Sequence, residues 1–180
     1  LDLHPLVGFD RTNVVAIGYK RAQEHNVLLN PDRSDPQRRF IMTYKDVDPE
    51  GSSRLMLATS GDGVNWTIDR HLSPIATNLR DGGHQVVHDP ERDRWLYYRR
   101  PPGLAQVSHL TVANIQRRYG VSVNDHLGPE GWSYPRMVLT PEEEADVPWI
   151  DHLTVLKWGT HFVGLWTGLD ERVEGLAETH

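Results

Sequence analysis

The sequence predicts an all-β protein made of repeated units of short antiparallel strands. Helical periodicity is nearly absent, and runs rich in Val, Leu, Tyr and Trp alternate with turns of Gly, Pro, Asp and Asn. The chain also repeats itself, since residues 25–31 (HNVLLNP) resemble residues 84–90 (HQVVHDP). A polar turn and a second strand-like run follow each copy, at 39–45 and 94–100, and a third copy opens at His152. A repeat of roughly 60 residues with four short strands is typical of a β-propeller blade.

A second repeated motif predicts the third and fourth strands of each blade. The turn at 60–66 (SGDGVNW) follows an alternating run at 54–59, which predicts a β-hairpin in which Asp accepts backbone N–H bonds and Gly supplies positive φ. The motif returns in residues 122–132, with Ser122 and Trp132 in place of Ser60 and Trp66. The outermost strands expected after the two turns span residues 67–74 and 133–141.

The repeats divide the single predicted domain into parts. Residues 1–23 correspond to the outer strand of a preceding blade and a linker, 24–80 and 81–150 to two whole blades, and 151–180 to part of another. Propellers usually close with about 4–8 blades. We therefore expect either a longer protein or a homo-oligomer in which copies of the chain complete the ring, because a lone copy would leave unpaired strand edges.

Composition excludes several classes of function. The chain has 180 residues and a formal net charge of −6, so broad attraction to nucleic acid or anionic lipid is not expected. No apolar run is long enough for a membrane span. With no cysteine, disulfides, zinc–thiolate sites and a cysteine nucleophile are excluded. Gly-rich phosphate loops, Gly-x-Ser-x-Gly elbows and His-Glu-x-x-His motifs are absent from the sequence.

The strand order predicts which residues share a face of the propeller. Residues before the first strand and after the second lie on one face, and the hairpin at 60–66 lies on the other, which makes Ser60, Asp62 and Trp66 structural. The first face collects Glu24, Asp81 and Asp151 near the axis.

Convergent carboxylates suit glycoside hydrolysis, in which one acid protonates the leaving oxygen and a second carboxylate acts as base or nucleophile. Their proximity raises the pKa of one of them, as the acid requires. Asp81 is the preferred catalytic candidate because Gly82 and Gly83 leave room for close approach. The alternative is that the acids cap strand entries or pair with Lys45, Arg99 and Arg100.

Other residues of this face are candidates for binding. The aligned histidines could ligate a metal ion in the central tunnel, or hydrogen-bond sugar hydroxyls or the acids. The two arginines could clamp a substrate carboxylate or sulfate, or be solvated. We assign substrate binding to His25, His84, His152, Arg99, Arg100 and Trp166, and no metal ligand.

Segment 54–66 (RLMLATSGDGVNW) resembles the S-x-DG-x-x-W blade signature of five-bladed propeller glycoside hydrolases, which include the invertase/levanase-like and arabinanase/xylosidase-like families. Segments 86–99 and 158–165 are similar to their inner hairpins. The resemblance implies hydrolysis of a glycosidic bond, with acidic catalytic residues at the starts of inner strands, where Glu24, Asp81 and Asp151 stand. The chain departs from the invertase-like members in lacking a Trp-x-Asn-Asp-Pro-like segment and an Arg-Asp-Pro motif. Asp151 also stands where a Glu acid is more usual.

Three functions follow from these observations. The first is a propeller glycosidase, or part of one, with a plant, algal or microbial glycan as its carbohydrate substrate. The second is a non-catalytic sugar-binding propeller, and the third is a structural module that assembles into a ring.

Overall fold

The computed structural model describes Tyr19, residues 22–77, Leu79, and residues 82–101, 118–139 and 149–169. Within these residues the chain forms eleven β-strands and one short 3-10 helix. The prediction of an all-β fold built from antiparallel sheets is therefore confirmed. In the same part of the chain, no helix has the length and apolarity that crossing a membrane requires.

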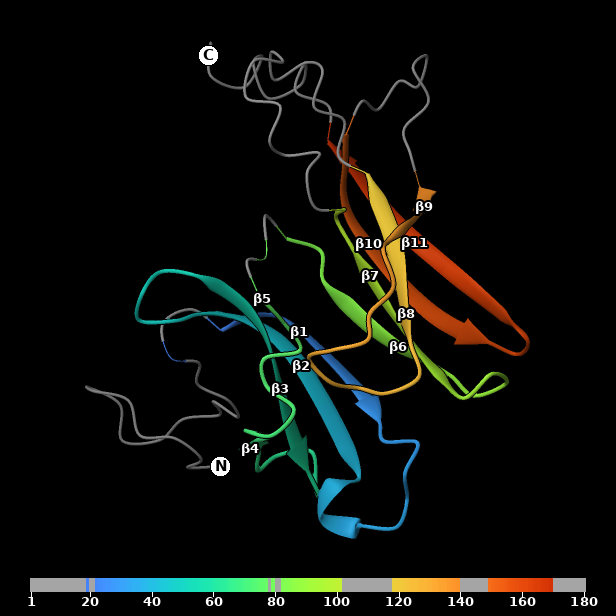
Figure 1. Cartoon of the computed structure of the whole chain (residues 1–180). Coiled ribbons are helices and arrows are strands. Elements are labelled where there is room, and N and C mark those ends of the chain that lie inside the picture. Colours follow the sequence, from blue (N-terminus) through green and yellow to red (C-terminus); the bar gives the residue numbers. More distant parts are fainter. Residues whose placement is uncertain are drawn as a thin grey trace, which may run out of the picture.

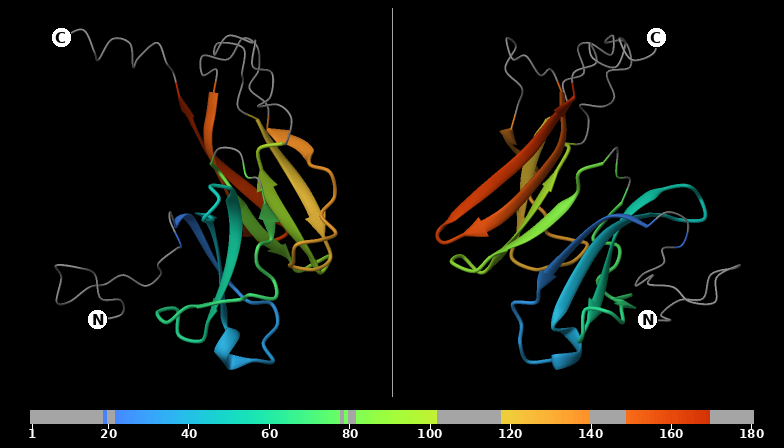
Figure 2. Two further views of the ribbon diagram at one scale, coloured as in Figure 1. Left: turned by 60° about the vertical axis from the view of Figure 1, so that its left-hand side comes forward. Right: turned by 180° about the vertical axis from the view of Figure 1, so that it is seen from behind.

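The strands form three antiparallel sheets, shown in Figures 1 and 2. The first sheet contains β1 (Gln23–Leu29), β2 (Phe40–Val47), β3 (Ser53–Ser60), β4 (Thr67–Ile68) and β5 (Ala76–Thr77). The second contains β6 (Gln85–Asp89), β7 (Arg94–Arg99), β8 (Tyr119–Asn124) and β9 (Arg136–Leu139). The third is the hairpin of β10 (Trp149–Trp158) and β11 (His161–Leu169). Strand β6 contacts both β1 and β10, so the first strands of the three sheets are neighbours.

The outer edge of the first sheet differs from the expected strand over 67–74. On the edge of β3 that faces away from β2, the short strands β4 and β5 pair with β3, and a turn separates them. The carboxylate of Asp69 accepts hydrogen bonds from the backbone N–H groups of His71 and Leu72, at 3.0 and 3.1 Å, which bends the chain away from the ladder. Pro74 has no N–H to donate to a sheet. The predicted continuous strand is therefore wrong. In the second sheet, β9 occupies the central part of the range expected at 133–141.

The 3-10 helix η1 (Pro36–Arg38) lies in the connection between β1 and β2, where the sequence predicts a polar turn. Asp35 caps it by accepting a hydrogen bond from the N–H of Gln37 at 2.9 Å.

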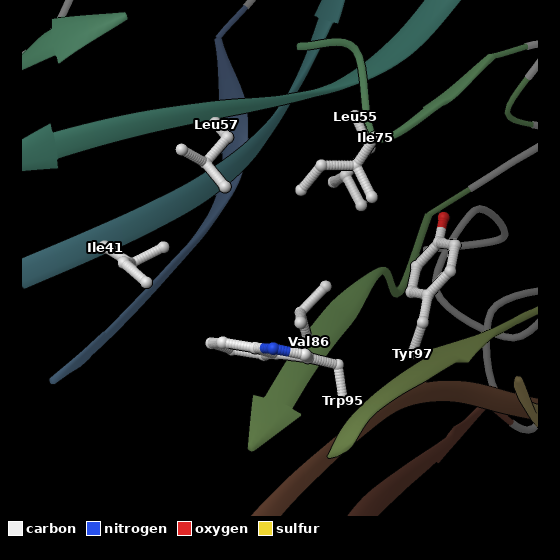
Figure 3. Packing of buried hydrophobic residues seen from close by; sticks show 7 residues of the cluster. All are labelled: Ile41, Leu55, Leu57, Ile75, Val86, Trp95 and Tyr97. Atoms are coloured by element: carbon white, nitrogen blue, oxygen red, sulfur yellow. The ribbon is translucent and has the colours of Figure 1, made fainter. Parts of the chain in front are cut away.

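The core fills the spaces between adjacent sheets, because the middle sheet is apolar on both faces. In β7, the side chains of Trp95 and Tyr97 pack toward the first sheet, whereas Leu96 and Tyr98 pack toward the third. This is the period-two alternation of a strand buried on both sides. The cluster between the first two sheets is shown in Figure 3 and consists of Ile41, Leu55, Leu57, Ile75, Val86, Trp95 and Tyr97.

Side-chain amides join the inner strands of adjacent sheets. Asn26 Nδ2 donates to the carbonyl of Val86 at 2.7 Å. Gln85 makes two bonds to Val155, since Nε2 donates to its carbonyl at 2.8 Å and Oε1 accepts from its N–H at 2.6 Å. Asn26 and Gln85 follow the repeated histidines His25 and His84. Amide side chains at equivalent positions of the repeat therefore fix the spacing of the three inner strands.

The hairpin after β3 has the structural role that its sequence predicts. Ser60 Oγ accepts from the N–H of Gly63 at 2.9 Å, and Asp62 Oδ1 accepts from the N–H of Asn65 at 2.8 Å. Several hydrogen bonds, of which the one from the N–H of Asn65 contributes most, hold the pKa of the Asp62 carboxyl well below its usual range. Ser60 pairs with the first residue of β2, while Gln23 pairs with Lys45 near its end. The hairpin and Glu24 thus lie at opposite ends of the sheet.

Candidate functional site

Two of the three predicted acids stand at irregular starts of inner strands. The pairing of β1 with β2 shifts register between Gln23 and Asn26, and that of β10 with β11 shifts between Ile150 and His152. Glu24 and Asp151 lie within these bulges, which re-aim side chains and are common beside active sites. Glu24 also has a φ of 57°, an uncommon conformation for a residue other than glycine. Asp81 lies outside the described residues.

The carboxylate of Glu24 is anchored across two sheets. Its Oε2 atom accepts hydrogen bonds from the N–H groups of Gly83 at 2.8 Å and His84 at 3.2 Å. Lys45 Nζ lies 3.8 Å from Oε1, and both side chains are mostly buried. A Cβ at Gly82 would stand 2.8 Å from Oε1, so the Gly82 backbone and the carboxylate lie close together. Glu24 therefore pairs with a basic residue, as the alternative interpretation predicts, and also holds the segment that follows Asp81.

The buried phenol of Tyr119 links the second and third sheets at this end. A Cβ at Gly83, whose φ is +81°, would lie 1.7 Å from the Tyr119 hydroxyl, so the backbone and the phenol are in close contact. The same hydroxyl donates to the carbonyl of Asp151 at 3.2 Å. Arg100 donates to that carbonyl at 2.7 Å and lies over the Tyr119 ring, with 5.7 Å from its Cζ to the ring centroid. Sequence reasoning did not identify Tyr119, because one aromatic at the start of a strand looks like ordinary core.

The three histidines line one small pocket but differ in environment. The pocket has a volume of about 110 Å³, and Glu24 also lines it. His25 is exposed and stacks on Tyr44, with ring centroids 5.8 Å apart. His152 is exposed, because it follows the bulge in β10.

His84 is only 5% exposed, and its Nδ1 lies 2.8 Å from the Tyr97 hydroxyl. In Figure 3 this hydroxyl points away from the apolar cluster. Burial lowers the pKa of His84 to about 4, so the ring is neutral at physiological pH. Burial also raises the pKa of Tyr97.

The metal interpretation of these histidines gains no support from the geometry. Among the residues that the structure describes, no group of three His, Asp or Glu side chains is placed to hold an ion. Contact with the Tyr97 hydroxyl occupies His84 Nδ1, while His25 is held against Tyr44.

The remaining binding candidates occupy different positions. Arg99 Nε donates to Ser122 Oγ at 3.2 Å, and its guanidinium lies over the Tyr97 ring at 5.2 Å from the centroid. Arg100 instead contacts Asp151, on the side of the third sheet. Trp166, half exposed on β11, pairs with Leu153.

Comparisons with known proteins support the fold. No protein-family model matches the sequence, and no curated protein matches it significantly. Among solved structures, the chain is similar to a thermostable family-43 glycoside hydrolase, with a TM-score of 0.56 and 14% identity over 85% of this chain and 47% of that one. It is also similar to a second glycoside hydrolase, with a TM-score of 0.57 and 13% identity over 87% of this chain and 45% of that one. The chain thus spans about half the length of these structures, and the expected resemblance to propeller glycoside hydrolases is confirmed at the level of the fold.

Proposed function

We propose that this chain forms the acid-bearing part of a propeller glycoside hydrolase, in which Asp81 and Asp151 transfer protons during cleavage of a glycosidic bond. The observation that carries the proposal is the contact of one phenol, Tyr119, with both acid-bearing segments. Its hydroxyl touches Gly83, two residues after Asp81, and donates to the backbone carbonyl of Asp151. This shared contact of two strand starts from different sheets supports a common role for their acids.

The chemistry needs two carboxyl groups in different protonation states. One carboxylic acid donates a proton to the leaving oxygen, while the other carboxylate activates water or attacks the sugar carbon. Glu24 is already an acceptor for two backbone N–H groups and lies beside Lys45. We therefore give Glu24 a positioning role, in which it holds the segment after Asp81 and its negative charge favours the protonated form of a nearby carboxyl.

The pocket beside Glu24 supports contact with a carbohydrate. The exposed imidazoles of His25 and His152 line it and could hydrogen-bond sugar hydroxyls. Its volume of about 110 Å³ is below the roughly 300–1,000 Å³ of complete ligand sites. We assign it to part of one sugar unit.

The test is hydrolysis of a panel of polysaccharides and aryl glycosides by the chain and by Asp81→Asn and Asp151→Asn. Loss of a proton-transfer group should lower kcat by about 10²–10⁴-fold. Asp125→Asn is the matched control, because Asp125 is exposed in the turn after β8, at the opposite end of the sheet. Full activity in both test variants would overturn the assignment. Binding of a glycan that the wild-type chain never hydrolyses would favour the non-catalytic alternative.

A further inference from the structure

We propose that Arg99 forms a subsite for an anionic group of the substrate, so that the glycan is acidic and carries a uronate carboxylate or a sulfate ester. This inference names the substrate class of the proposed glycosidase and rests on that proposed function. It concerns Arg99 alone, because Arg100 is bound to the backbone of Asp151 on the other side of β7.

The guanidinium of Arg99 is held in place before any ligand arrives. Nε donates to the hydroxyl of Ser122, which is buried, and the guanidinium lies over the Tyr97 ring. Tyr97 is itself fully buried and in contact with His84. Fixing a long side chain in advance lowers the entropy cost of binding a ligand.

The outer nitrogens of Arg99 have no carboxylate partner in the described residues, which sets it apart from other arginines of the chain. Ion pairs with aspartate carboxylates are made by Arg38, Arg54, Arg92 and Arg94. Arg99 has no ion pair of this kind within the described ranges, although it is half-buried. The planar edge formed by the two terminal nitrogens of a guanidinium matches a carboxylate or a sulfate through paired hydrogen bonds, while Nε of Arg99 is used by Ser122.

The position of Arg99 places this charge beside the proposed reaction centre. In the second sheet Gln85 pairs with Tyr98, so Arg99 lies next to the strand start that carries His84. Its positive charge, together with that of Lys45, adds to the lowering of the pKa of His84.

The experiment compares matched substrates on the wild-type chain, Arg99→Gln and Arg99→Lys. The substrates are an aryl uronide, its neutral methyl ester and a sulfated aryl glycoside. Loss of a charge-assisted bond should lower kcat/KM on an anionic substrate by about 10–100-fold in Arg99→Gln, and leave the ester within about two-fold. Arg99→Lys should retain part of the activity, since it keeps the charge but not the planar fork. The control is Arg136→Gln, because Arg136 is exposed on the outer strand of the same sheet.

Direct binding separates this inference from the proposed function. Calorimetry with an oligogalacturonate and a sulfated galactan oligosaccharide needs no turnover. If wild type binds either one, and Arg99→Gln loses that binding, the subsite stands even if no glycan is hydrolysed. The preferred oligosaccharide identifies the anion as carboxylate or sulfate. Equal activity of wild type and Arg99→Gln on anionic substrates would overturn the inference and leave the glycosidase intact. The inference is equally refuted if wild type binds neither oligosaccharide.

Discussion

Replacement of Gly83 by alanine tests the close contact that joins the sheets at the candidate site. A Cβ at this position would lie 1.7 Å from the hydroxyl of Tyr119, and 2.6 Å from the ring carbon that bears it. Tyr119 is fully buried and cannot turn away into solvent. Either its ring or the backbone at Gly83 must therefore move.

Two costs add in this variant. The φ of +81° at Gly83 disfavours any residue with a Cβ, by about 1–2 kcal/mol. Overpacking against a rigid buried ring typically costs a further ~1–3 kcal/mol. The free energy of unfolding should thus fall by about 2–5 kcal/mol, and the melting temperature by roughly 4–20 °C for a domain of this size.

The assay is urea unfolding followed by tryptophan fluorescence, with the m-value checked for constancy. Gly159→Ala is the matched control, because Gly159 has a φ of +57° but nothing within 4 Å of the added Cβ. It should cost about 1–2 kcal/mol, from conformation alone. In a Tyr119→Phe background, Gly83→Ala should cost about 1 kcal/mol less than in wild type, since the nearest colliding atom is gone. If Gly83→Ala costs no more than Gly159→Ala, the inferred contact does not exist.

Three further outcomes test other parts of the structure. Gln85→Ala should lower the free energy of unfolding by about 1–3 kcal/mol, because it leaves the N–H and carbonyl of Val155 without partners, and an unchanged urea midpoint would contradict this. Ser60→Ala should cost about 1–2 kcal/mol by freeing the N–H of Gly63, yet leave kcat/KM unchanged, since the hairpin lies at the other end of its sheet. His84 has a pKa of about 4 in the fold against 6.5 as the ordinary value, so the unfolded chain binds its proton more tightly. Stability should be complete above about pH 6.5 and decrease toward pH 4 by up to about 3 kcal/mol, and a His84→Gln variant that keeps the same slope would refute this.

The positions of the strands and of the turns between them could be predicted because they depend on local chemistry. The run from Trp95 to Tyr98 is apolar at four successive positions, as expected of a strand buried on both faces, and the structure packs it that way. The turn at 60–66 has its own side-chain acceptors, so its conformation does not depend on distant contacts. The outer edge of the first sheet was predicted less well, because the turn at Asp69 competes with strand pairing there.

The positions of the candidate site residues could be predicted only in part. Sequence alignment made His84 and His152 equivalent, yet the first is buried and the second is exposed. The bulge in β10 accounts for the difference, because one extra residue moves the side chains that follow it to the other face of a strand. No local pattern in the sequence marks such a bulge.

The all-β fold and its repeated antiparallel units could be predicted from the sequence alone, since alternation and turn residues act over a few positions. Packing between the sheets, by contrast, sets the contact of Glu24 with the Gly83 backbone and the contacts of Tyr119 with two sheets, and it leaves Arg99 without a carboxylate partner in the described residues. These features arise between residues that are far apart in the chain and meet only when the sheets pack together. Their geometry is therefore set by packing rather than by the local preference of any one strand.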